Sequence, residues 1–537
     1  MDLRYGLYIK WSPTDNDYTD ETAYLLSAEG QSNLTDPTAR VMGGRGMVGA
    51  ISFTLDNSTG RFSVDNPLSP ITAELSTWQF YMSPGYLKIS VDGGVTWDNV
   101  ASFVLSDPLE AIATYAGHPA VTFSGYDRAF LLMQALDTTG LLSEWWDGDA
   151  DRWHQYREDE LIDYALTQAG YVDGVDYVSQ AHHRTYPNIL ATLEPGMIPV
   201  SWFWLENESP WEELQRLAGA CLGYFLHTPG SPSSPNGWFR YWNMAHWLTQ
   251  LAGGPQLTLY TGNIQDVTPR WDPNELYGKV TTAVTPRAPG MIREIWQAPA
   301  LPYLRPGETV HQIANVSSPM YAVYTPARDT DYYAASTTGV NLTNSIVVSS
   351  WQQYAQRVEF DLTNNHATRS AQFYKLQLRG RTLEAGEEQM AEAESDLTYW
   401  QAGTRPKRVR EMTNNAYIQS MSHGDTIAQV LLSASETMRF RAKAMLTSAT
   451  AHPRRRLGDV VRLVNTRSGW DVLCVLTALS WRLVDGRFQQ EIEIVDARAF
   501  YPRSEFFTCG RHALGAAPPP PGGAESSEVV PTAALFW

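Results

Sequence analysis

Residues 51–128 alternate short apolar and polar stretches with turn-forming residues, and this pattern constrains the fold more than any other feature of the chain. Apolar and polar residues alternate along residues 51–55, as a strand with one buried face requires. Residues 56–60 (Asp-Asn-Ser-Thr-Gly) and 92–94 (Asp-Gly-Gly) supply side chains that tolerate a positive φ in turns. Several such hairpins within about 130 residues predict a closed barrel or a sandwich.

A second strand-rich region occupies residues 457–495. Apolar stretches within residues 457–483 are followed by an Asp-Gly pair, which favours a tight two-residue turn, and by an alternating final strand at 488–495. Glu491 and Glu493 fall on the polar face of that strand, where we expect them to line solvent or a lumen. The region predicts a second β meander, similar to the first.

Helical spacing appears between these two regions. Apolar residues recur on one face of residues 157–169, and the acidic first turn suits the positive end of a helix dipole. Ser209 precedes a proline and is followed three residues later by Glu212, which predicts a helix start with a capping box. Residues 422–435 also have helical spacing, with Ser422 as the expected cap.

The order of several short motifs resembles that of phage tail hub proteins, including the baseplate hubs of contractile phages. The resemblance covers residues 1 to about 500 and is loosest in the middle third. Its motifs are Leu-Asp-Asn-x-x-Gly-x-Phe (55–62), Asn-Pro-x-Ser-Pro (66–70), Ser-Gly-Tyr-Asp-Arg (124–128), Ser-x-x-Glu-x-Leu-x-x-Leu-Ala (209–218), Asn-x-Tyr-Ile-Gln-Ser (415–420) and Leu-Gly-Asp-x-Val (457–461).

This resemblance implies an α+β, mainly β fold, in which two tube-like antiparallel β-barrel domains are separated by mixed helix and hairpin domains. The boundaries that we expect are 1–135 for the first barrel, 136–256 for a mixed α/β hub domain, 257–355 for strands of the second barrel, 356–456 for a mixed domain with a helix at 422–435, 457–500 for the closing strands of the second barrel, and 501–537 for a Pro/Gly-rich C-terminal tether.

The resemblance also implies a structural role without catalysis, at the tail tip of a virion assembled in the host cytoplasm. Three copies with two barrels each would adapt a sixfold tail tube to a threefold tip and form part of the DNA-ejection channel. The implied partners are the other copies of a homotrimer, the tail tube or distal tail protein, the tape-measure protein and the tip or fibre proteins, with DNA only passing through. A tail-associated cell-wall hydrolase or a glycan-binding module is the alternative, favoured by the 19 tryptophans.

Composition restricts the possible partners. The formal net charge of −18 argues against a protein that grips nucleic acid along its surface, although DNA can slide past an acidic wall. Cys221, Cys474 and Cys509 lack metal-ligand spacing, so we expect no disulfide framework, zinc module or cofactor. The first ten residues do not resemble a signal peptide and no run of about 18 apolar residues occurs, so we expect a soluble protein without stable membrane insertion.

One segment has metal-like spacing. Asp147, Asp149, Asp151 and Glu158 occupy positions 1, 3, 5 and 12 of a calcium-loop template. Position 6 is Arg152, where the sharp turn of the loop requires glycine. A solvated acidic loop therefore explains the segment better than a calcium site.

Two other clusters contain reactive residue types. His182 and His183 are adjacent, so on a strand their side chains would point to opposite faces, and a surface loop is favoured over a metal site. Ser422, His423 and Asp425 are the residue types of a catalytic triad, but such close neighbours rarely align nucleophile, base and orienting acid. We therefore expect Ser422 to cap its helix and assign no catalytic residue.

The interface candidates are basic runs and the end of the sequence. The runs at 405–410 and 454–456 are not interleaved with stacking aromatics, which favours a salt-bridged interface or a solvated loop over nucleic-acid binding. Burying the last three side chains would contribute roughly 1.5–3 kcal/mol each and would anchor the tether on a neighbouring subunit. The candidate residues are Arg405, Lys407, Arg408, Arg410, Leu535, Phe536 and Trp537.

Overall fold

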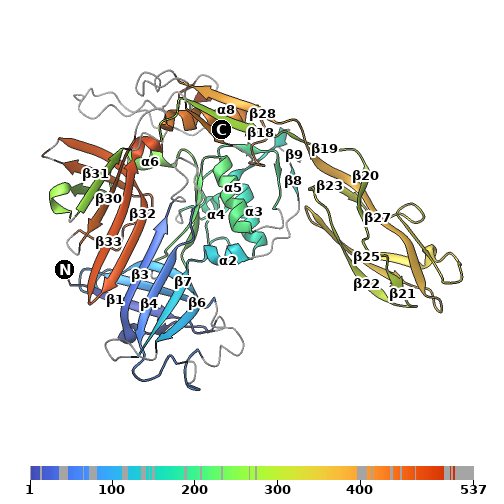
Figure 1. The fold of residues 1–537 in the computed structure, drawn as a ribbon, viewed down its shortest axis with the longest axis horizontal. Helices are drawn as coiled ribbons and strands as arrows, with labels where there is room; N and C mark the ends of the chain where they lie inside the picture. The colour runs from blue at the N-terminus through green and yellow to red at the C-terminus, as the bar shows by residue number, and fades with distance from the viewer. Residues whose placement is uncertain are drawn as a thin grey trace.

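The structure of the protein is a computed structural model that is mainly β, with helices concentrated in its centre (Figure 1). The described residues are 2–12, 15–34, 46–63, 66–71, 82–111, 119–134, 141–143, 145–147, 152–186, 190–205, 209–231, 234–264, 266–271, 275–395, 408–412, 415–435, 439–447, 450–465, 467, 469–500, 508–509 and 512–513. Among the described helices, none combines the length and the apolar character needed to span a membrane.

Two groups of strands, which we call the first and second β modules, form one 13-stranded sheet. The first module consists of β1 (Arg4–Ile9), β2 (Thr19–Asp20), β3 (Leu25–Asn33), β4 (Ala50–Asp56), β5 (Pro84–Ser90), β6 (Asp98–Ala111) and β7 (Ala120–Tyr126). The second consists of β16 (Leu257–Tyr260), β17 (Asp266–Trp271), β30 (Phe440–Leu446), β31 (Val460–Asn465), β32 (Trp470–Val484) and β33 (Arg487–Asp496).

Strands β3 and β32 join the two modules edge to edge. They pair antiparallel from Ser27 opposite Val484 to Asn33 opposite Ala478. Each module thereby uses one edge for the other module instead of closing on itself, and no described sheet is a closed barrel. The two closed barrels expected from the sequence are therefore not confirmed. Each module is an open, curved sheet, antiparallel apart from the parallel pair of β16 and β31 (Figure 1).

The hydrophobic side chains of both modules belong to one buried cluster. It extends from Leu7 and Phe53 in the first module to Trp481 and Ile494 in the second. In β4 the alternation read from the sequence is confirmed, because every second side chain is buried. The shared cluster makes the two modules one packed unit.

Helices and short hairpins form a central domain between the modules. Its elements are α2 (Ala129–Gln134), β8 (Leu142–Ser143), β9 (Trp145–Asp147), β10 (Arg152–His154), β11 (Tyr156–Arg157), α3 (Glu158–Gln168), α4 (Gln180–Thr185), β12 (Pro199–Val200), β13 (Trp202–Phe203), α5 (Pro210–Ala220), β14 (Tyr224–Thr228), β15 (Trp238–Trp242) and α6 (His246–Ala252). A small sheet of β18 (Lys279–Val284), β28 (Gln389–Glu394) and β29 (Val409–Met412), covered by α8 (Met421–Ser435), shares its core.

Two of the motifs that carry the family resemblance contact each other in this shared core. The Asn415 side-chain amide donates to the Arg216 carbonyl, and the Tyr417 hydroxyl oxygen lies 2.7 Å from the Glu213 carboxylate. The Gln419 amide donates to the Trp202 carbonyl at 2.7 Å. The motif at 415–420 therefore fixes the segment before α8 against α5.

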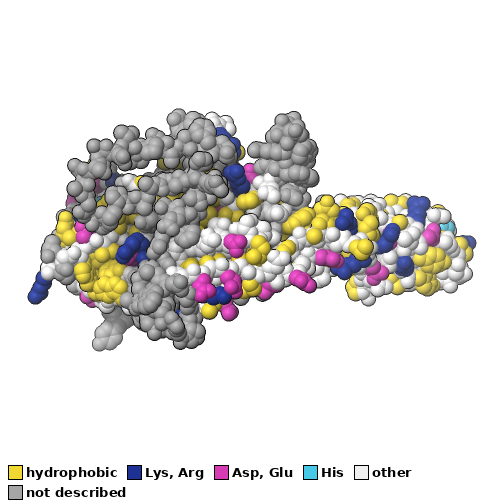
Figure 2. All heavy atoms as spheres, turned by 90° about the horizontal axis from the view of Figure 1, so that it is seen from above, with side chains coloured by type: hydrophobic (Ala, Val, Ile, Leu, Met, Phe, Trp, Pro, Cys, Tyr) yellow, Lys and Arg dark blue, Asp and Glu magenta, His cyan; other side chains and the backbone are white. Residues whose placement is uncertain are grey.

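Residues 287–385 form an arm that projects away from the modules and the central domain (Figures 1 and 2). Its own core lies between a sheet of β22, β25 and β26 and a sheet centred on β27. The strands are β19 (Arg287–Pro289), β20 (Arg293–Gln297), β21 (Tyr303–Leu304), β22 (Thr309–Asn315), β23 (Met320–Tyr324), β24 (Tyr332–Ala335), β25 (Ile346–Gln353), β26 (Arg357–Asn364) and β27 (Ala371–Ala385).

The arm divides the segment 257–355 that the sequence assigned to the second barrel. Only β16 and β17 of this segment join the second module, where β16 pairs in parallel with β31 and β17 pairs with β30. The strands of this segment that follow β18, from β19 to β25, pair within the arm. Alternation identifies a strand and its buried face, but it carries no information on which distant strand completes the sheet.

Candidate functional site

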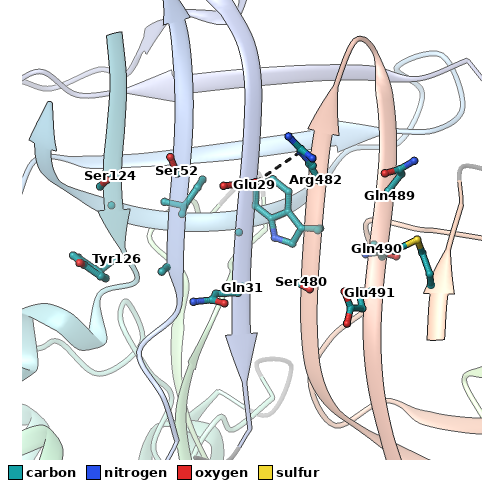
Figure 3. A pocket seen from close by; sticks show the side chains of 16 residues that line it. Glu29, Gln31, Ser52, Ser124, Tyr126, Ser480, Arg482, Gln489, Gln490 and Glu491 are labelled. Atoms are coloured by element: carbon teal, nitrogen blue, oxygen red, sulfur yellow. Dashed lines mark ion pairs between the residues drawn. The ribbon is translucent and has the colours of Figure 1, made fainter. Parts of the chain in front are cut away.

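A concave face lies between the two β modules at their junction. It holds a cavity of about 590 Å³, with β3, β4 and β7 on one side and β30, β32 and β33 on the other (Figure 3). The residues labelled in that view are Glu29, Gln31, Ser52, Ser124, Tyr126, Ser480, Arg482, Gln489, Gln490 and Glu491.

The cavity floor depends on one glycine opposite one tryptophan. Gly30 pairs with Trp481 across the junction, and an added Cβ on Gly30 would lie 2.6 Å from the Trp481 ring. The indole is only 6% exposed, so it fills the space that this glycine leaves open. The continuous sheet therefore requires a residue without a side chain at position 30.

The face is hydrophilic and carries few charges. Serine hydroxyls and glutamine amides predominate, and the Glu29–Arg482 pair, at 3.8 Å, is about two-thirds exposed on both sides. An exposed ion pair of this kind contributes little to the free energy of folding, and its two charges cancel. Glu491 lines the cavity, as expected for the polar face of the final strand, and Glu493 lies on the same strand. Such a face offers no concentrated positive charge to a phosphate backbone.

The basic run at 454–456 closes the junction from one side. Arg454 Nε lies 3.1 Å from both carboxylate oxygens of Asp98, at the start of β6. Arg456 donates to the Asn99 carbonyl at 2.9 Å. This run forms a salt-bridged contact between the two modules of one chain, one of the two explanations that the sequence favoured.

A second, smaller cavity of about 60 Å³ lies behind this contact and is lined by Asp127 and His227. Asp127 accepts hydrogen bonds from the backbone amides of Gly49 and Ala129, and burial raises the pKa of its carboxyl to about 7. Burial lowers the pKa of His227 to about 3, so its ring is neutral and bonds to the Asn236 carbonyl. Asp127 thereby links the segment before β4 to the start of α2, whereas His227 stabilises the β14–β15 hairpin.

Of the four calcium-loop candidates, only the Glu158 side chain lies within the described residues. Asp149, Asp151 and the side chain of Asp147 lie outside the described residues. Glu158 is fully buried and accepts backbone hydrogen bonds from Met197 and Ile198 at 2.7 and 3.0 Å. No group of His, Cys, Asp and Glu able to hold a metal occurs within the described residues.

The histidine and serine clusters serve local structure. His182 and His183 lie in the short helix α4, where a surface loop was expected. The His423 ring bonds to the Ala220 carbonyl at 2.8 Å, and burial lowers its pKa to about 4. Ser420, not Ser422, accepts from the His423 amide at the start of α8. The expected cap is thus displaced by two residues.

The helix starting after Ser209 is confirmed, but its cap differs from the expectation. Helix α5 begins at Pro210, yet the Ser209 hydroxyl is buried without a hydrogen-bond partner. Glu213, not Glu212, turns inward, toward Arg216 and Tyr417. Tertiary contacts with the segment before α8 replace the local capping box here.

The remaining interface candidates are partly described. Arg408 is exposed beside the Tyr277 ring, and Arg410 on β29 has a buried guanidinium nitrogen without a hydrogen-bond partner. Arg405, Lys407, Leu535, Phe536 and Trp537 lie outside the described residues. Sequence reasoning missed Gly30 with Trp481 and Arg454 with Asp98, because each pair is far apart in the chain and carries no local motif.

No protein-family model matches the sequence, and no curated protein sequence matches it. Among solved structures, the chain is similar to the 43 kDa tail protein of prophage MuSo2 from Shewanella oneidensis, with 10% identity, a TM-score of 0.46, and 92% of this chain and 99% of that chain covered. A tail protein from Neisseria meningitidis is 10% identical with a TM-score of 0.44, covering 93% and 99% of the two chains. An E. coli component of the type VI secretion system is 8% identical with a TM-score of 0.40, covering 92% and 78%.

Proposed function

We propose that this protein is a structural hub of a phage tail, in which three copies form a ring at the distal end of the tail tube. The ring adapts a sixfold tube to a threefold tip and forms part of the channel through which DNA leaves. Its partners are the tail tube or distal tail protein, the tape-measure protein and the tip or fibre proteins, as the sequence resemblance implies. The protein acts by shape and assembly, not by catalysis.

The observation that carries this proposal is the pairing of β3 with β32. It places two β modules side by side in one chain, and it leaves β2 in the first module and β16 and β17 in the second as edge strands of the described sheet. A chain with two modules of similar build, each with a free edge strand, can repeat around an axis, and three copies then present six modules. Such a ring of six modules would match a tail tube with sixfold symmetry.

The concave face supports a channel lining. Its hydroxyl, amide and carboxylate groups interact well with water but do not form a cationic surface that would retain DNA. The chain carries a formal net charge of −18, which also disfavours lasting contact with phosphate. We infer that the concave face between the two modules of each chain points toward the axis of the ring.

Native mass spectrometry of the full chain tests the assembly. The proposal predicts a species of about 180 kDa, three times the chain mass of 60.1 kDa, that binds tail tube protein. A protein that stays monomeric at micromolar concentration and clears purified cell wall in a zymogram would contradict it, and would favour the hydrolase alternative instead.

A further inference from the structure

Tyrosine side chains gather on the outer face of the sheet centred on β27 in the arm. Tyr303, Tyr321, Tyr324 and Tyr374 are between 43% and 58% exposed, and Tyr333 is half-buried beside Tyr374, with ring centroids 6.1 Å apart. All five lie on β27 or on strands paired with it. Exposed aromatic side chains concentrated on one face mark an interaction surface.

Within the described residues, neither Lys375 nor Arg381 on β27 has a carboxylate partner. Lys375 Nζ donates to the Thr330 carbonyl at 2.6 Å, whereas Arg381 donates to the Gly290 and Pro289 carbonyls and lies over the Tyr321 ring. By contrast, Arg379 between them is neutralised by Asp331. The arm as a whole carries nine Lys or Arg against seven Asp or Glu, although the full chain has a net charge of −18. The face is therefore suited to an acidic partner with large apolar side chains.

The chain contains such a segment outside the described residues. Residues 524–537 read Ala-Glu-Ser-Ser-Glu-Val-Val-Pro-Thr-Ala-Ala-Leu-Phe-Trp, with two glutamates and no cation. Residues 501–523 connect it to Phe500, whose ring packs on Trp247. At up to roughly 3.3 Å per residue this connector spans about 75 Å, and the segment itself about 45 Å, close to the length of the 15-residue strand β27.

We propose that residues 524–537 of this protein dock along the tyrosine-lined face of the arm. Glu528 meets Lys375, and Phe536 with Trp537 pack among the exposed tyrosine rings. The contact uses aromatic burial for affinity and opposite charges for direction. It does not depend on the proposed hub function, because both surfaces belong to one polypeptide.

A photo-crosslinking amino acid placed at position 536 of the full chain tests the docking. After irradiation, peptide mapping should place most crosslinks in the β23, β24 and β27 peptides of the arm. Tyr374→Ala should lower that yield roughly tenfold, as expected for loss of an aromatic anchor. The control Tyr260→Ala removes an exposed tyrosine from the second module and should leave the yield unchanged.

Charge exchange gives a second readout that misfolding does not imitate. Lys375→Glu should lower the arm crosslinks roughly threefold, and adding Glu528→Lys should restore them. Crosslinks that map to the concave face or the second module, or an arm yield unchanged by Tyr374→Ala and Lys375→Glu, would overturn the proposal. A monomeric protein with intact arm crosslinks would remove the hub function and leave this inference standing.

Discussion

At the scale of single residues, the junction of the two modules depends on close contact at Gly30. The backbone of β3 approaches the Trp481 indole so closely that an added Cβ would meet the ring at 2.6 Å. The indole is buried within the cluster shared by the modules, so a new Cβ at position 30 would displace packed atoms. A side chain at this position would push the two modules apart.

Gly30→Ala should therefore lower the free energy of unfolding by about 1–3 kcal/mol, the usual cost of overpacking a dense interior. The matched control is Gly262→Ala, because a Cβ at Gly262 meets open space, and its effect should stay within about 0.5 kcal/mol. Urea unfolding of both variants measures the difference. Equal effects at the two positions would show that the junction is not tightly packed.

A buried acid in the central domain should make stability depend on pH. Burial raises the pKa of Glu158 to about 7. The folded state then holds this proton more tightly than the unfolded chain does. The resulting stabilisation is fully present below the ordinary pKa of about 4.5 and is lost as the pH rises through about 7.

Glu158→Gln removes this titration and should flatten the pH profile of stability. The free energy of unfolding of the wild type should fall by an additional 1–3 kcal/mol, approximately, between pH 5 and pH 8 relative to the variant. Asp127 titrates in both proteins, so its contribution cancels in the difference, whereas Asp159 interacts with the Glu158 charge and contributes to the measured change. Parallel profiles in urea unfolding at several pH values would contradict the assignment.

At the scale of elements, the register of β3 against β32 decides which side chains reach the concave face. Gln31 pairs with Ser480, and both line the cavity. A slip by one residue would turn every side chain of one strand to the opposite face. The register therefore determines which side chains line the concave face.

A pair of introduced cysteines tests this register. Gln31→Cys with Ser480→Cys, in a Cys509→Ser background, should form a disulfide on mild oxidation and add about 2–4 kcal/mol to stability. Ser32→Cys with Ser480→Cys is the control, because these side chains point to opposite faces and should not crosslink. Cys221 and Cys474 are buried and do not interfere. Non-reducing electrophoresis with peptide mapping distinguishes the two outcomes.

Local elements were predictable from the sequence, and their partners were not. Apolar spacing located α3, α5 and α8 to within a residue or two, since a helix is defined by neighbours three and four residues apart. The pairing of β3 with β32, the separation of the arm and the unpaired Ser209 hydroxyl depend on contacts between distant segments. The concave site is formed by such contacts, so only its polar strand face at Glu491 was expected.

At the scale of the whole molecule, we propose that the concave face points inward and the arm points outward in the ring. Figure 1 shows the arm projecting from the side of the molecule away from the second module. In a ring whose channel is lined by the modules, the arms would reach away from the axis. Reagents of different size should distinguish these two environments.

Ser52→Cys on the concave face and Ile313→Cys on β22, in the other sheet of the arm, make this comparison, again in a Cys509→Ser background. A small maleimide should label both positions in the assembled ring. A maleimide carrying a long polyethylene glycol chain should label the arm readily and the concave face much more slowly, until the ring is dissociated. Equal labelling by the large reagent in the assembled state would place the concave face outside.

We propose that two modules in each chain let three chains match a sixfold tube. Electron microscopy of the purified full-length protein, viewed down the symmetry axis of its assembly, measures this most directly. We expect three chains around one axis, with six β modules in a ring, the concave face of each chain pointing inward, and three arms pointing outward. A monomer, a dimer, or a trimer whose modules do not form one ring would contradict it.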